Sequence, residues 1–162
     1  MARLVGAPLL GVVGPSGSGK SSLVRAGLLH AVAGGVLPGS ERWWRALMRP
    51  GRHPVAELER VYQAGRGLLV VDQFEECFTS GAGEQERAAF VERLLAITAE
   101  GAVVVVVAIR ADFYGRCAAY PAFSRLLGAN HVLVTPMSRE EHARAIERPA
   151  QRAGLTVEPD LL

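Results

Sequence analysis

Short, continuously apolar runs alternate along the chain with longer segments of helical periodicity. The runs Leu9–Val13, Leu68–Val71 and Ala102–Ile109 place apolar side chains at nearly every position, which is typical of strands buried on both faces of a sheet. The segments Trp43–Met48 and His131–Thr135 are predicted as two further strands. Strands that are buried on both faces need helices on both sides, so the pattern favours a parallel sheet between two helical layers.

The segments between these runs supply the helices. Helical spacing of apolar residues, bounded by glycines and prolines, predicts helices over Lys20–Ala33, Val55–Ala64, Glu84–Glu100, Asp112–Leu127 (broken near Pro121) and Ser138–Ala153. The last of them begins with the Ser-Arg-Glu-Glu pattern of a capping box. We therefore expect an α/β fold with three layers: a mostly parallel sheet of about five strands and helices on both faces. Ligands of such sheets bind at the carboxyl ends of the strands.

Length and composition narrow the class of protein. The 162 residues suffice for one domain, and 49% are hydrophobic, which is typical of a globular chain. A net charge of +2 argues against a nucleic-acid or membrane-surface partner, and the longest apolar run is far below the ~20 residues of a membrane helix. With only two cysteines we expect reduced thiols and a cytoplasmic location.

The first strand leads into a glycine-rich loop of the phosphate-binding type. Residues 14–21 match the pattern G-x-x-x-x-G-K-S between an apolar strand and an amphipathic helix. Glycines let successive backbone N–H groups face one anion, and the following helix directs its positive end to the same point. Lys20 is the only lysine among 18 basic residues, and its compact ammonium group can reach the terminal phosphates. The candidate nucleotide-binding residues are Gly14, Pro15, Ser16, Gly17, Ser18, Gly19, Lys20, Ser21 and Ser22.

A carboxylate follows the strand Leu68–Val71. In phosphate-loop proteins such an aspartate helps to hold Mg²⁺, so Asp72 and the Ser21 hydroxyl are the candidate metal ligands. Glu75 is our first candidate for the group that orients the attacking water, and Glu76 is the second. Both could instead be solvated residues at a helix start. Gln73 occupies the place where many such ATPases carry a catalytic glutamate, which is compatible with slow hydrolysis.

The strand Ala102–Ile109 ends at Arg110. A guanidinium at that strand end could pair with the terminal phosphate and report its presence, so Arg110 is a third candidate catalytic residue. The alternative is a structural arginine that pairs with Asp112. The sequence alone leaves these two roles open.

Four segments, 12–29, 68–79, 108–121 and 132–155, together resemble the STAND class of signalling phosphate-loop ATPases, and within it the bacterial novel STAND NTPases. The segments DQFEE and RADFYGR are the specific ones. The resemblance implies binding of ATP with Mg²⁺, hydrolysis that acts as a conformational switch, Glu75 and Glu76 as an acidic extension similar to that of NACHT proteins, and Arg110 as a sensor.

The resemblance also implies partners and a domain division. We expect a core at about residues 1–136, and in 137–162 the start of a truncated helical lid, so that the chain is a fragment of a longer protein. A C-terminal WD40-like repeat sensor and self-association in the ATP state are further expectations. Three alternatives stay open: a non-hydrolysing ATP-bound interaction module, a nucleotide kinase, and an ABC-type ATPase, whose signature motif would have to precede Asp72.

Overall fold

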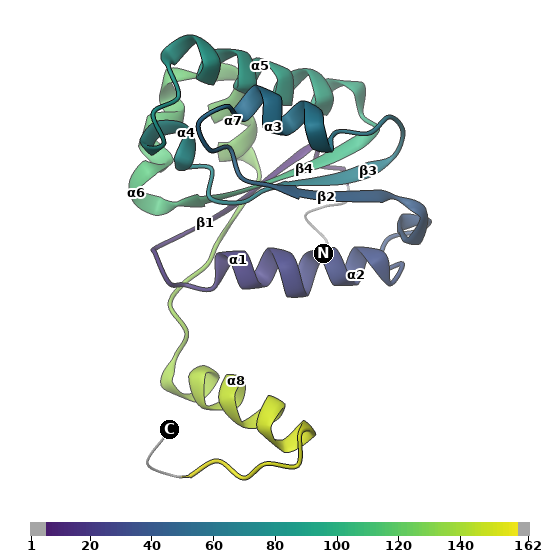
Figure 1. Ribbon diagram of the computed structural model, residues 1–162, viewed down its shortest axis with the longest axis vertical. Coiled ribbons are helices and arrows are strands. Elements are labelled where there is room, and N and C mark those ends of the chain that lie inside the picture. Colours follow the sequence, from purple (N-terminus) through teal and green to yellow (C-terminus); the bar gives the residue numbers. More distant parts are fainter. Residues whose placement is uncertain (1–5, 159–162) are drawn as a thin grey trace.

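The fold is a parallel sheet between two helical layers (Figure 1). The structure is a computed structural model that describes residues 6–158. Its five strands lie in the order β2-β3-β4-β1-β5, and every neighbouring pair is parallel. The strands are β1 (Leu9–Gly14), β2 (Trp44–Met48), β3 (Gly67–Val71), β4 (Val103–Arg110) and β5 (His131–Leu133). The predicted fold class and all five strands are confirmed, although β5 is shorter than expected.

Helices cover both faces of the sheet. One face carries α3 (Pro54–Val61), α5 (Glu84–Glu100) and α7 (Pro121–Ala129), and the other carries the run of α1 (Lys20–Ser22), the π-helix η2 (Leu23–Leu29) and α2 (His30–Ala33) (Figure 1). The shorter elements are η3 (Ser40–Arg42), α4 (Glu76–Thr79), α6 (Ala111–Tyr114) and η4 (Gly115–Ala119), and α8 (Arg139–Arg152) follows β5. No helix in this described part of the chain has the length and hydrophobicity needed to span a bilayer.

The structure corrects two predicted helices. The segment Asp112–Leu127 is divided into α6, η4 and α7, with Pro121 at the start of α7, where its missing N–H costs nothing. Helix α3 ends at Val61 and not at Ala64, because Tyr62 turns into an extended conformation and its ring packs edge-on against Trp44 at 5.9 Å. Aromatic packing thus overrides helix propensity at this end.

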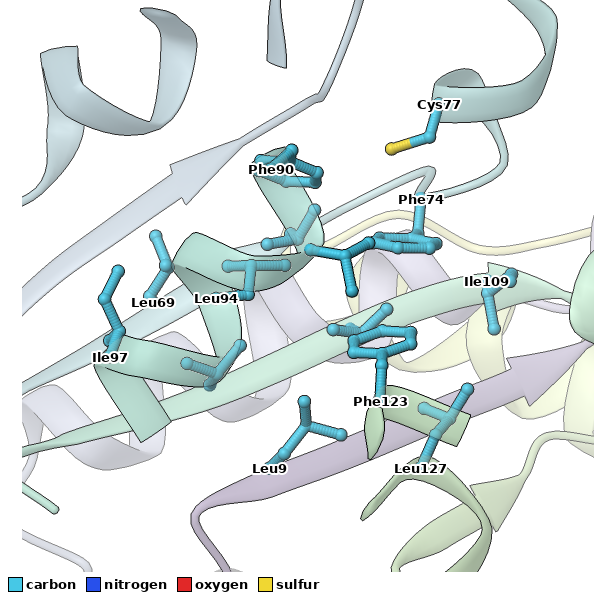
Figure 2. Close-up of a cluster of buried hydrophobic side chains, with 14 of the residues drawn as sticks. Leu9, Leu69, Phe74, Cys77, Phe90, Leu94, Ile97, Ile109, Phe123 and Leu127 are labelled. Atoms are coloured by element: carbon cyan, nitrogen blue, oxygen red, sulfur yellow. The ribbon is translucent and has the colours of Figure 1, made fainter. Parts of the chain in front are cut away.

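Alternate residues of the central strands fill two separate cores. In β3, Leu69 and Val71 face the layer of α3, α5 and α7, whereas Leu68 and Val70 face the helical run of residues 20–33. The larger core is centred on Phe74, whose ring stacks against Phe123 at 5.1 Å and Phe90 at 6.1 Å (Figure 2). Phe74 lies two residues after Asp72, so its burial anchors the acidic segment to the core.

Helix α8 lies apart from the three layers (Figure 1). The predicted capping box is present, since Ser138 Oγ accepts from Glu141 N at 3.2 Å and Glu141 Oε2 accepts from Ser138 N at 2.8 Å. None of its residues is buried, and Ile146 is 40% exposed. Local capping therefore stabilises α8, which has no residue buried against the sheet.

Candidate functional site

The strand order brings the predicted site residues to one edge of the sheet. Strand β4 lies between β1 and β3, and the register pairs Gly14 with Arg110. The loop after β1, Asp72 after β3 and Arg110 at the end of β4 therefore meet at adjacent carboxyl ends. They surround a small cleft of about 110 Å³ lined by Ser16, Gly17, Lys20, Ser21, Asp72, Gln73, Glu75 and Arg110.

The loop requires glycine at different positions for different structural reasons. Gly17 and Gly19 have φ angles of 75° and 87°, a left-handed region that other residues rarely adopt. Gly14 is required by space, because a Cβ there would lie 2.4 Å from the carbonyl oxygen of Val134 and 2.8 Å from Ser18 Oγ. Val134 is itself held by a hydrogen bond from its N–H to Val13 O at 2.6 Å. The segment after β5 thus packs directly against the start of the loop.

The Lys20 ammonium group lies inside the loop. Its Nζ donates to the carbonyl oxygens of Gly14 at 2.9 Å and Pro15 at 2.7 Å, and the residue is only 9% exposed. Burial lowers the pKa of Lys20, while Glu75 and Asp72 oppose that shift and Arg110 adds to it. A cation held by neutral carbonyl oxygens near these carboxylates is suited to an incoming anion.

Asp72 accepts hydrogen bonds on both carboxylate oxygens. Ser21 Oγ donates to Oδ1 at 2.8 Å, and Gln73 N donates to the same oxygen at 3.0 Å. Arg25 Nη2 donates to Oδ2 at 3.0 Å in an ion pair. The Asp72 side chain is only 1% exposed. Its hydrogen bond with Ser21 Oγ brings the two predicted metal ligands together.

The adjacent residues Glu75 and Glu76 contact different parts of the structure. Glu75 lines the cleft, and its Oε2 accepts from the backbone N–H of Arg110 at 3.2 Å. Glu76 begins α4 and accepts from the backbone N–H of Gly51 at 3.1 Å. Glu75 therefore belongs to the site, whereas Glu76 ties α4 to the loop after β2.

Gln73 stands at the turn between Asp72 and these glutamates. Its φ of 55° is the only positive value of a non-glycine residue in residues 6–158. With its amide oriented to satisfy both neighbours, it donates to Glu76 Oε1 at 2.8 Å and accepts from Arg49 Nη2 at 3.2 Å. The strained backbone lets Phe74 N reach Ala108 O at 2.9 Å, which closes the turn over the end of β4.

Arg110 pairs with Asp112, which is the structural role that the sequence analysis set beside the role of phosphate sensor. Its Nη2 and Nε donate to the two carboxylate oxygens of Asp112, at 2.7 and 3.1 Å, and its guanidinium lies 5.2 Å from the centre of the Phe113 ring. The same side chain lines the cleft. Arg110 is thus held at the rim of the site by a partner on the surface.

The remaining loop residues flank the cleft. A neighbouring hollow of about 270 Å³ is lined by Gly17, Gly19, Lys20, Ser21 and Ser22. Ser18 is 5% exposed, and its Oγ has no hydrogen-bond partner in the described part of the chain. Pro15 contributes through its carbonyl oxygen, which accepts from Lys20.

Three residues with a role in this geometry were not predicted: Arg25, Arg49 and Val134. Arg25 could have been found, because it lies four positions after Ser21 on one helix and therefore on the same side. The contacts of Arg49 and Val134 depend on which strands are neighbours, and residue spacing carries no such information.

Comparison with known proteins identifies the family of the chain. The family model described as Novel STAND NTPase 1 matches residues 1–162. The chain belongs to this family. Membership confirms the resemblance seen in the sequence and makes the chain an NTPase-family domain. No relative was found among curated proteins.

Solved structures of phosphate-loop ATPases share the fold. The chain is similar to the Walker-type ATPase PABY2304 of Pyrococcus abyssi, with a TM-score of 0.61 and 16% identity over 97% of this chain and 57% of that chain. It is also similar to DnaA from Aquifex aeolicus bound to AMPPCP, with a TM-score of 0.65 and 14% identity over 99% of this chain and 51% of that one. The chain thus spans about half the length of these proteins, and the likeness is evidence of fold alone.

Proposed function

We propose that this Novel STAND NTPase 1 domain binds ATP with Mg²⁺ and acts as a slowly hydrolysing nucleotide switch in signalling. The single observation that carries the proposal is the contact of Ser21 Oγ with Asp72 Oδ1 at 2.8 Å, one residue away from a buried lysine inside a glycine-lined loop. Two oxygen ligands beside a phosphate cradle fit Mg²⁺, which keeps most of its waters and takes few protein ligands. When bound, the metal would neutralise charge on the terminal phosphates.

The loop residues would hold the triphosphate. In this proposal the backbone N–H groups of residues 16–20 face the phosphates, and the Lys20 ammonium exchanges its two carbonyl contacts for phosphate oxygens. Ser18 Oγ, which has no hydrogen-bond partner among residues 6–158, offers one further polar group in the loop. Ser21 and Asp72 would hold the metal on the side facing β3.

Glu75 is the residue that the geometry favours for orienting water. It lines the cleft together with Lys20 and Asp72, whereas Glu76 is engaged with Gly51 and Gln73. We assign Glu75 the role of general base or water-positioning group and Glu76 a structural role. Arg110 would leave Asp112 for the terminal phosphate and so report whether that phosphate is present.

A non-hydrolysing ATP-bound module is the second candidate. The observation that favours it is Gln73, whose amide is taken up by Glu76 and Arg49 and which has no carboxylate to activate water. In that case the ATP would serve as a structural ligand, and the same loop residues would bind it.

The helix α8 fits the proposed start of a lid that closes over the nucleotide. Ile146 on α8 and Leu155, three residues after its end, are 40% and 64% exposed and are free to pack against further elements. We propose that residues 137–162 form the lid start, that a WD40-like sensor regulates it, and that the ATP state self-associates. Size-exclusion chromatography of the protein with and without Mg-ATP tests the last point.

Nucleotide binding is tested by thermal unfolding. Mg-ATP should raise the melting temperature, because a ligand that binds only the native state stabilises it by about 2.7 kcal/mol at 100-fold excess over Kd. Lys20→Ala should abolish the rise, and Arg60→Ala, an exposed arginine on α3, should leave it intact. An unshifted melting curve of the unmodified protein at saturating Mg-ATP contradicts the proposal.

Turnover separates the switch from the non-hydrolysing module. Glu75→Gln should retain the thermal shift and lower phosphate release by ~10²-fold, the usual contribution of a positioned base. Glu76→Gln should change turnover much less, because that side chain serves the loop at Gly51. Equal turnover in the unmodified protein and Glu75→Gln removes Glu75 from the role, and absence of turnover in both favours the module.

A further inference from the structure

Arg25 places a permanent positive charge on the carboxylate of Asp72. The guanidinium Nη2 lies 3.0 Å from Oδ2, while Ser21 Oγ and Gln73 N occupy Oδ1 at 2.8 and 3.0 Å. Both oxygens of the carboxylate are therefore already hydrogen-bonded by this chain's own groups. A buried carboxylate is stabilised by such a counterion, because an uncompensated charge in a protein interior is costly.

The helix geometry delivers Arg25 and Ser21 to the same carboxylate. The two residues lie four positions apart in the continuous helical run of residues 20–33, so they share one side of the helix. From Leu23 to Leu29 this run is a π-helix, a form that often occurs at functional sites. The hydroxyl reaches one carboxylate oxygen and the guanidinium reaches the other.

The two members of the ion pair differ in freedom. Asp72 is 1% exposed and is fixed at the end of β3, where its backbone N–H donates to Met48 O at 2.9 Å. The Arg25 side chain is 46% exposed and extends from the helix surface. The carboxylate therefore stays in place, whereas the guanidinium can swing into water without unfolding any element.

We propose that Arg25 is a positioning residue that competes with the divalent cation for Asp72 and thereby sets the Mg²⁺ requirement of the site. This inference rests on the proposed function, since it takes Ser21 and Asp72 as the metal side. A dication and a guanidinium on one carboxylate repel each other, so Arg25 on Oδ2 opposes the binding of a divalent cation to Asp72. Arg25 thus orients the Asp72 carboxylate, and at the same time it lowers the affinity of the site for Mg²⁺.

The experiment is a Mg²⁺ titration of nucleotide binding, read from the fluorescence of N-methylanthraniloyl-ATP. In Arg25→Gln the Mg²⁺ concentration at half-saturation should fall about twofold to fivefold, the range expected for loss of one partly exposed charge contact. The matched control is Arg60→Gln, which removes another arginine–carboxylate pair (Arg60 with Glu57) far from the cleft and should leave the midpoint unchanged.

A second measurement needs no nucleotide. Without Mg²⁺, Arg25→Gln should melt roughly 2–6 °C below the unmodified protein, because Asp72 loses its counterion. Added MgCl₂ alone should raise the melting temperature of Arg25→Gln more than that of the unmodified protein. In an Asp72→Asn background the Arg25→Gln change should no longer shift the Mg²⁺ midpoint, since the carboxylate for which both compete is gone.

The outcomes separate the two proposals. A lower Mg²⁺ midpoint in Arg25→Gln that disappears in the Asp72→Asn background supports the competition. An unchanged or higher midpoint, with N-methylanthraniloyl-ATP bound by both proteins, overturns the role of Arg25 and leaves ATP binding standing. If Arg25→Gln does not fold, Arg25→Lys is the substitute, because it keeps the positive charge. Arg25→Lys should fold, and its Mg²⁺ midpoint should be close to that of the unmodified protein. A tenfold lower Mg²⁺ midpoint in Arg25→Lys also overturns the inference. Failure of the unmodified protein to bind the nucleotide at any Mg²⁺ concentration overturns the proposed function, and the inference with it.

Discussion

Replacing Gly14 by alanine tests whether the phosphate loop is shaped by contact with the segment after β5. The added Cβ would lie 2.4 Å from Val134 O and 2.8 Å from Ser18 Oγ, and real Cβ atoms do not approach backbone oxygen so closely. The serine side chain can rotate away. The Val134 carbonyl cannot move alone, because the same residue is hydrogen-bonded through its N–H to Val13 at 2.6 Å.

The expected cost follows from these contacts. Relief of the clash requires β1 and the segment after β5 to separate locally, and overpacking of this kind typically costs 1–3 kcal/mol, so we take about 2 kcal/mol. For a chain of this length each kcal/mol lowers the melting temperature by about 2–4 °C, which predicts a fall of roughly 4–8 °C in Gly14→Ala. The displaced loop should also bind Mg-ATP more weakly.

Two other alanine variants separate this clash from backbone strain. In Gly17→Ala no atom of residues 6–158 lies within 4 Å of the new Cβ, but φ is 75°, so the change should cost about 1–2 kcal/mol through strain alone. Gly83→Ala meets neither obstacle, since its φ is −66° and its surroundings are open, and its stability should change by less than about 0.5 kcal/mol. Urea unfolding of all three gives the comparison. A Gly14→Ala protein as stable as Gly83→Ala would refute the reasoning.

Three further predictions concern the core, the thiols and α8. Phe74→Ala should lower the free energy of unfolding by about 3–5 kcal/mol in urea titrations, because the ring is fully buried among other aromatic rings. Burial raises the pKa of the Cys117 thiol from 9.0 to about 12, so the folded state keeps the thiol proton to higher pH than the unfolded state. The free energy of unfolding should therefore fall between pH 9 and about 12. Cys117→Ala should lose less stability over that pH range. Ser138→Ala should speed amide hydrogen exchange in α8 by roughly fivefold through loss of the cap, and the melting temperature should stay unchanged because α8 contributes no buried residue.

The sequence by itself predicted the five strands, most of the helices and a loop of the phosphate-binding type. Continuous apolar runs indicated strands buried on both faces, because residues that face either helical layer must be apolar in the centre of such a sheet. The G-x-x-x-x-G-K-S pattern indicated a phosphate loop, and the capping box at Ser138 was confirmed because its hydrogen bonds are local. The capping box and the loop motif are local in the chain, and the burial of the strands shows in their composition.

Only the tertiary structure decided which strand ends meet and what each polar group contacts there. Periodicity does not specify strand neighbours, so the place of β4 between β1 and β3 was not evident. The sequence ranked Glu75 before Glu76 but did not show what either contacts; the turn at Gln73 and the start of α4 direct Glu75 into the cleft and Glu76 to Gly51. Likewise the pairing of Arg25 with Asp72 joins residues 47 positions apart. The physical reason is that hydrogen bonds and ion pairs depend on distance in space, which the packing of the sheet and its helices establishes.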